Sequence, residues 1–228
     1  MKEYTIPLDQ RQVDLFFSPI RDKVDIINTL MKTIKLLLVQ KASDVPNPKG
    51  EVKLVVSNMS RIFFFSENKY FSINFPFSFR PPCADLGLLF YSKNIEEIDN
   101  KTTSDVITLL ADTDRFSENS VLDFIEPISD LEPDEENIWP FFLELFMYED
   151  GYIRYDYDEK HVNGALHPLN HYDVFHTSKA TFKIGLTDRL EKKQFIDLVD
   201  TKTDCHFVTK ETKSKKGKWG KKLFLNKG

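Results

Sequence analysis

Four of the five histidines in this chain lie between residues 161 and 176, directly after the charged segment GYIRYDYDEK. That segment carries Arg154, Asp156 and Asp158 at alternating positions. Imidazoles and carboxylates bind metals, transfer protons and hold polar ligands, so a region that contains both is a candidate functional site. We therefore expect the chemistry of this protein to lie between residues 151 and 176.

Strand geometry indicates which of these side chains can lie together on one face of a sheet. Side chains of an extended strand alternate between its two faces, which places Arg154 and Asp156 on one face. The same alternation in the segment HYDVFHT places His171 and Asp173 together. If the two strands pair, all four side chains share one face of the sheet, and His167 joins them from the end of the intervening loop.

Three interpretations of this constellation stay open. In the first, it binds a phosphorylated or nucleic-acid ligand without chemistry; the ligand-binding residues are then Arg154, Asp156, His167 and His171. In the second, a divalent metal activates water, which makes the protein a metal-dependent nuclease or phosphodiesterase; the candidate catalytic residues and metal ligands are then His167, His171 and Asp173. In the third, these side chains form structural ion pairs and loop caps.

Familiar catalytic motifs do not decide between these interpretations. The HxxxH spacing spans Pro168, so it is not the HExxH helix of a metalloprotease. The chain also lacks GxxxxGK[ST], GxGxxG and GxSxG, which excludes the common phosphate-binding loops and the hydrolase nucleophile elbow. His161 and His176 fall outside the shared face and are treated as its neighbours.

Composition indicates one folded domain with a core rich in strands. The chain has 228 residues, of which 41% are hydrophobic and 20 are phenylalanine, and aromatic residues favour strands. The two cysteines form no CxxC pair, which fits a reducing compartment. With no apolar run of about 18 residues and no apolar N-terminal segment, we expect a cytoplasmic protein without membrane contact.

Charge is unevenly distributed along the chain. The formal net charge is −5, yet residues 210–228 contain eight lysines and one acidic residue, whereas residues 116–153 contain eleven acidic residues and no basic one. We therefore expect a single domain over residues 1–209 and a basic tail over 210–228, either solvated, bound to nucleic acid or docked as an edge strand. The acidic surface suggests a protein partner, as in a non-catalytic subunit of a complex.

Periodicity predicts an α+β fold with a long N-terminal helix packed on a strongly curved, mainly antiparallel sheet, with additional helices. A short helix from about Asp9 precedes a break at Ser18-Pro19 and a long helix to about Ala42. A turn at Glu149-Asp150-Gly151 is expected to join two strands. The predicted strands are 52–57, 61–66, 69–79, 86–92, 139–148, 151–158, 171–177 and 180–186; the further predicted helices are 103–112, 117–128 and 188–201.

The last third of the chain resembles a bacterial family of unknown function, DUF2290. The resemblance rests on RYDYD, followed by HPLNH, ATFKIGL and EKKQFIDLV, with Arg154, Asp156, His167, Pro168 and His171 at the matching positions. It implies a prokaryotic cytoplasmic protein encoded near mobile-element or antiviral-defence genes. It implies no particular activity.

Overall fold

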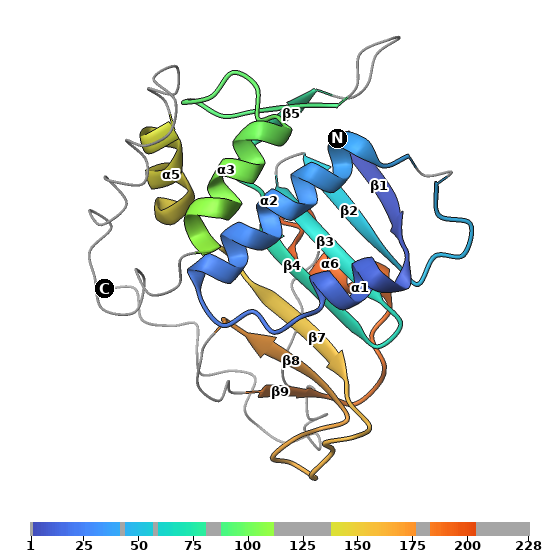
Figure 1. Ribbon diagram of the computed structural model, residues 1–228. Helices are drawn as coiled ribbons and strands as arrows, with labels where there is room; N and C mark the ends of the chain where they lie inside the picture. The colour runs from blue at the N-terminus through green and yellow to red at the C-terminus, as the bar shows by residue number, and fades with distance from the viewer. Residues whose placement is uncertain are drawn as a thin grey trace, which may run out of the picture.

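The main element of the fold is a seven-stranded sheet in which every neighbouring pair is antiparallel (Figure 1). The computed structural model describes residues 2–41, 44–56, 59–80, 88–111, 138–176 and 183–203. In spatial order, the strands are β1 (Lys2–Leu8), β2 (Gly50–Val56), β3 (Ser60–Ser66), β4 (Lys69–Asn74), β7 (Ile153–Tyr157), β8 (Asn170–Val174) and β9 (Lys183–Leu186). A separate two-stranded sheet contains β5 (Ser78–Arg80) and β6 (Leu89–Tyr91).

Alternating side chains give this sheet two apolar faces. In β3, Ile62 and Phe64 belong to one buried cluster, whereas Phe63 and Phe65 belong to another. Successive side chains of a strand point to opposite faces, so the uninterrupted apolar run IFFF is explained by burial on both sides. Helices must therefore cover both faces of the central strands.

The helices α1 (Gln10–Phe16) and α2 (Lys23–Val39) cover the first face (Figure 1). Each begins at an aspartate whose side chain accepts a backbone N–H: Asp9 from Gln12 at 2.8 Å and Asp22 from Asp25 at 3.0 Å. Such caps satisfy the free amides of a helix start. Between the two helices lies the predicted break at Ser18-Pro19.

Three further helices among the described residues contribute to the two cores. On the first face, α3 (Asn100–Ala111) and α5 (Ile138–Met147) extend the cluster buried beneath α2. On the second face, α6 (Lys192–Val199) contributes Phe195, whose ring lies 6.3 Å from that of Phe63 and 5.9 Å from that of Tyr70. In Figure 1, α6 lies behind the sheet and α2 in front of it.

The α+β class is confirmed as mixed helices with a mainly antiparallel sheet, but the start of the chain differs from the prediction. A strand, β1, comes first, and the first helix, α1, has only seven residues. The alternation of the buried residues Ile6 and Leu8 with their neighbours is the signal of this unpredicted strand. The predicted strong curvature of the sheet stays a prediction.

Helix α5 covers residues 139–147, so the strand predicted at 139–148 is wrong. Its buried residues lie at positions 138, 141, 142 and 145, which is the spacing of a helix face. This spacing outweighs the β-propensity of its aromatic residues. The turn at Glu149-Asp150-Gly151 therefore joins α5 to β7 and does not close a hairpin.

Several predictions lie outside the described residues. These are the helix at 117–128, the basic tail at 210–228 with the domain boundary at 209, and most of the acidic stretch at 116–153. Among the described helices, none combines the length and the apolar character needed to span a bilayer.

Candidate functional site

Strand register brings the predicted residues together on one face of β7, β8 and β9. Asp156 lies directly opposite His171, and Arg154 lies opposite Asp173, which in turn lies opposite Lys183 on β9. We call these five residues the polar cluster. The predicted pairing of the two strands is confirmed, and their charged side chains converge as alternation requires.

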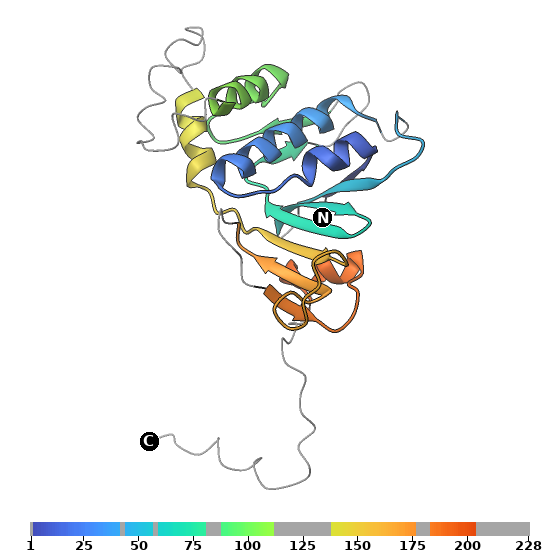
Figure 2. The ribbon, with the colours of Figure 1, turned by 60° about the horizontal axis from the view of Figure 1, so that its bottom comes forward.

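The polar cluster occupies the part of the first face that α1 and α2 leave uncovered. Tyr155 and Tyr172 belong to the apolar cluster beneath α6 on the second face, so the alternating Arg154 and His171 point to the opposite side. Figures 1 and 2 show α1 and α2 over β1–β4, with β7–β9 extending beyond them. The sheet therefore changes from an apolar to a polar surface along a single face.

Two buried carboxylates bind one guanidinium at the centre of the cluster. The Arg154 Nε–H donates to Asp156 Oδ2 at 2.9 Å, and Nη2 lies 2.8 Å from the same oxygen. Nη2 also donates to Asp173 Oδ2. Burial alone would lower the pKa of Arg154, but Tyr152 and the two carboxylates outweigh it and raise the pKa.

Lys183 joins the cluster from β9. Its ammonium lies 2.8 Å from Asp173 Oδ1 and 3.0 Å from His171 Nε2. The other ring nitrogen, His171 Nδ1, lies 2.8 Å from the Pro168 carbonyl oxygen. A carbonyl only accepts, so Nδ1 carries the hydrogen and Nε2 presents its lone pair to the cluster.

Asp156 is ionised, but only one of its two carboxylate oxygens has a hydrogen-bond partner among the described residues. Burial raises the pKa of its carboxyl, yet the hydrogen bond from Arg154 and the charges of Arg154 and Lys69 prevail and lower it. Its Oδ1 is buried and has no hydrogen-bond partner among the described residues. A buried oxygen of an ionised carboxylate without a donor is costly, which marks this atom as a point where a ligand would be accommodated.

The β7–β8 connection brings His167 to the edge of the cluster. A bridge between Asn163 and His167 closes a tight turn, and the His167 ring lies 4.8 Å from that of His171. Burial and the nearby charge of Lys183 lower the pKa of His167. Its Nε2 lies 3.3 Å from Asp158 Oδ2, but the geometry makes no hydrogen bond.

His161 and His176 lie outside the cluster, as the sequence predicts. His161 binds Asp158, with 2.9 Å between Nδ1 and Oδ2, and most of its side chain is exposed. His176 lies 2.9 Å from Asp150, on the turn before β7. Asp158 follows the end of β7 and accepts the backbone N–H of His161 at 3.1 Å, so it organises the loop.

Lys183 is the member of the cluster that the sequence does not predict. The sequence places it in a predicted strand, ATFKIGL, without a role. A lone lysine beside an isoleucine in a strand carries little information until its partner strand and register are known. Register with β8 is what places it opposite Asp173.

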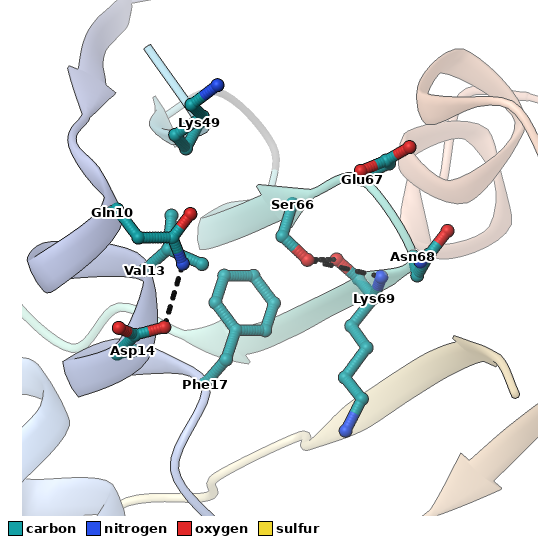
Figure 3. Close-up of a pocket in the computed structure, with 9 residues that line it drawn as sticks. All are labelled: Gln10, Val13, Asp14, Phe17, Lys49, Ser66, Glu67, Asn68 and Lys69. Carbon is teal, nitrogen blue, oxygen red and sulfur yellow. Dashed lines mark hydrogen bonds between the residues drawn. The ribbon is translucent and has the colours of Figure 1, made fainter. Parts of the chain in front are cut away.

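The described residues also form a cavity of about 420 Å³ beside α1, distinct from the cluster (Figure 3). It is lined by Gln10, Val13, Asp14, Phe17, Lys49, Ser66, Glu67, Asn68 and Lys69. Figure 3 shows Lys69 extending from the β3–β4 turn toward β7, where its partner in the register is Asp156. Lys69 therefore adds a positive charge beside the cluster, whereas the cavity itself mixes both signs.

Comparisons with known protein families, curated proteins and solved structures found no match to this chain. Membership in the DUF2290 family stays a prediction from the segments quoted above.

Proposed function

We propose that this protein binds the phosphate of a phosphorylated ligand or nucleic acid through a basic rim, formed by Arg154, His167 and Lys183. The supporting observation is that the rim side chains are more exposed than the carboxylates beneath them. The three rim side chains are 27%, 25% and 19% exposed, in that order, whereas those of Asp156 and Asp173 are 5% and 1% exposed. An anion arriving from solvent meets the Arg154 and Lys183 cations and the His167 imidazole first, whereas a cation would have to pass between these side chains to reach the carboxylates.

The rim retains donors for such a ligand. Arg154 Nη1 has one long contact, 3.4 Å to the Tyr152 hydroxyl. Lys183 has three N–H groups and two partners, Asp173 and His171. Guanidinium and ammonium donors are the groups with which proteins bind phosphate oxygens.

The buried carboxylates hold the rim in place. Asp173 binds Arg154 and Lys183 through different oxygens, which fixes the two cations relative to each other. Side chains already held in their binding geometry lose less conformational entropy when a ligand arrives. Asp156 and His171 act here as positioning residues.

The test is phosphate binding by the Lys183→Gln variant. Inorganic phosphate is titrated by isothermal titration calorimetry at low salt, and we expect at least tenfold weaker binding than in the wild type. Lys193→Gln removes the same charge from an exposed position of α6 and should bind as the wild type does. No binding by the wild type, or equal binding by the two variants, would contradict the proposal.

A parallel titration separates the two sources of phosphate. A single-stranded thymidine decanucleotide presents phosphodiesters, and its binding is followed by fluorescence polarisation. Tighter binding of the oligonucleotide than of inorganic phosphate, lost in Lys183→Gln, assigns the rim to nucleic acid. The reverse order assigns it to a small phosphorylated molecule.

A second candidate, metal-dependent phosphodiester hydrolysis, is favoured by one specific observation. Asp156, His171 and Asp173 each offer a ligand atom, and these three atoms lie within 4.8 Å of one another. The Nδ1–H bond to Pro168 aims the His171 Nε2 lone pair as in metal-bound histidines. Unlike the predicted ligand set, this one includes Asp156 and not His167.

The same variant distinguishes the two candidates. Lys183 is bound to two of the three potential ligands, so its ammonium competes with a divalent cation for them. If the cluster is a metal site, Lys183→Gln should bind Mn²⁺ more tightly than the wild type, measured by electron paramagnetic resonance. Mn²⁺ binding that is absent in both proteins would exclude the metal site.

A further inference from the structure

Arg61 is buried on the other face of the sheet without a carboxylate partner among the described residues. Only 8% of the residue is exposed. Its Nε–H donates to Ser72 Oγ at 3.0 Å, Nη1 donates to Asn74 Oδ1 at 2.6 Å, and Nη2 donates to the Gly151 carbonyl. All three acceptors are neutral.

This arrangement differs from that of Arg154, which binds two carboxylates. Burial lowers the pKa of Arg61 to about 10, so the guanidinium stays charged at neutral pH. A buried charge that is not compensated by an opposite charge is destabilising. Each terminal nitrogen also carries a second N–H beyond those used for Asn74 and Gly151.

A cavity of about 480 Å³ lies against this arginine. The residues that line it include the apolar Met59, Phe75 and Val199, together with Tyr148. The buried Tyr148 hydroxyl has no hydrogen-bond partner among the described residues. A concave apolar site with a few converging polar groups is typical of small-molecule binding.

We propose that this cavity binds a small organic monocarboxylate, with the carboxylate on Arg61 and its apolar portion against Met59, Phe75 and Val199. A single guanidinium matches a single negative charge. The exposed Glu149 at the same cavity disfavours a dianion such as a phosphate monoester. The site is independent of the basic rim, which lies on the opposite face of the sheet.

The test uses benzoate as the probe and benzamide, its neutral isostere, as the control ligand. Isothermal titration calorimetry of the wild type is expected to detect benzoate and not benzamide. Arg61→Gln should weaken benzoate binding at least tenfold, whereas Arg21→Gln, at an exposed arginine outside the cavity, should leave it unchanged. Equal benzoate binding by Arg61→Gln and the wild type overturns the proposal, as does a wild type that binds neither ligand.

A second variant keeps the test decisive if Arg61→Gln fails to fold, since Arg61 also holds the Gly151 carbonyl. Val199→Trp, at the end of α6, fills the cavity from its apolar wall and leaves the arginine in place. We expect this variant to lose benzoate binding while its circular dichroism spectrum matches that of the wild type. Benzoate binding that survives in a folded Val199→Trp variant overturns the proposal.

Discussion

Lys183 lies directly opposite Asp173 across the β8–β9 pair, with 2.8 Å between its ammonium nitrogen and Asp173 Oδ1. The other oxygen of the same carboxylate binds Arg154. Asp173 therefore links an edge strand, β9, to β7 across β8. Loss of this one carboxylate should affect all three strands.

We expect Asp173→Asn to lower the free energy of unfolding by about 3 kcal/mol, because Arg154 then keeps Asp156 alone and the partly buried Lys183 loses the carboxylate that it binds. Chemical denaturation followed by circular dichroism measures the change. Asp188→Asn, at an exposed position after β9, is the matched control and should stay within about 0.5 kcal/mol of the wild type. A similar small effect in both variants would show that the ion pairs contribute little.

The lowered pKa of Asp156 predicts that the protein loses stability in acid. The pKa of its carboxyl is lower in the folded protein than the ordinary value of 3.8. The unfolded chain therefore binds more protons between the two values, so stability is present above about pH 4 and is lost as the pH falls through the folded pKa. Asp156→Asn should unfold less steeply than the wild type below pH 4 in a pH titration at constant denaturant. If the stability of Asp156→Asn falls as steeply with pH as that of the wild type, the prediction is wrong.

Gly151→Ala should destabilise the turn between α5 and β7. Gly151 has φ +53°, and an added Cβ would lie 2.7 Å from the Asn74 side-chain oxygen and nitrogen. Asn74 has little freedom to move because it binds Arg61 at 2.6 Å and the Glu149 carbonyl at 2.8 Å. We expect a loss of about 2 kcal/mol in thermal or chemical unfolding.

Gly164 offers the control for this substitution. Its φ is +51°, but an added Cβ would have no neighbouring atom within 4 Å. Gly164→Ala should therefore cost only the backbone strain, about 1 kcal/mol. If both substitutions lower the stability equally, the contact with Asn74 contributes nothing to the effect of Gly151→Ala.

Phe195→Ala should release α6 from the sheet. The Phe195 ring is fully buried and lies 6.2 Å from that of Phe65 and 6.5 Å from that of Tyr172. Removing a buried phenylalanine costs about 3–5 kcal/mol. Hydrogen exchange should show faster exchange of the α6 amides. Met147→Ala, at a residue that is 83% exposed, should change neither the free energy of unfolding nor the exchange rate of these amides.

Period-two patterns predicted most of the sheet, because a strand is locally encoded by alternation. The pattern at residues 69–79 nevertheless spans two strands of different sheets, β4 and β5. Pro76 lies between them and cannot donate a ladder hydrogen bond. Long-range packing decides which sheet a strand joins, so the local pattern of residues cannot predict it.

The candidate site was predictable to the extent that it depends on alternation within two strands. Arg154 and Asp156, and likewise His171 and Asp173, are two positions apart in the sequence, so their common face follows from local geometry. Arg61 and Lys183 were not predictable in this way. Their partners lie on other strands, and a lone basic residue in an apolar strand identifies no partner.

The sheet places β4 beside β7, although residues 75–152 separate them in the chain. During synthesis from the N-terminus, β4 therefore remains an open edge until β7 has been made. The polar cluster lies on β7, β8 and β9, which follow residues 75–152 in the chain. A ribosome that stalls within residues 75–152 would leave β4 as an unpaired edge and no candidate site, so the nascent chain exposes an aggregation-prone strand edge before the site can form.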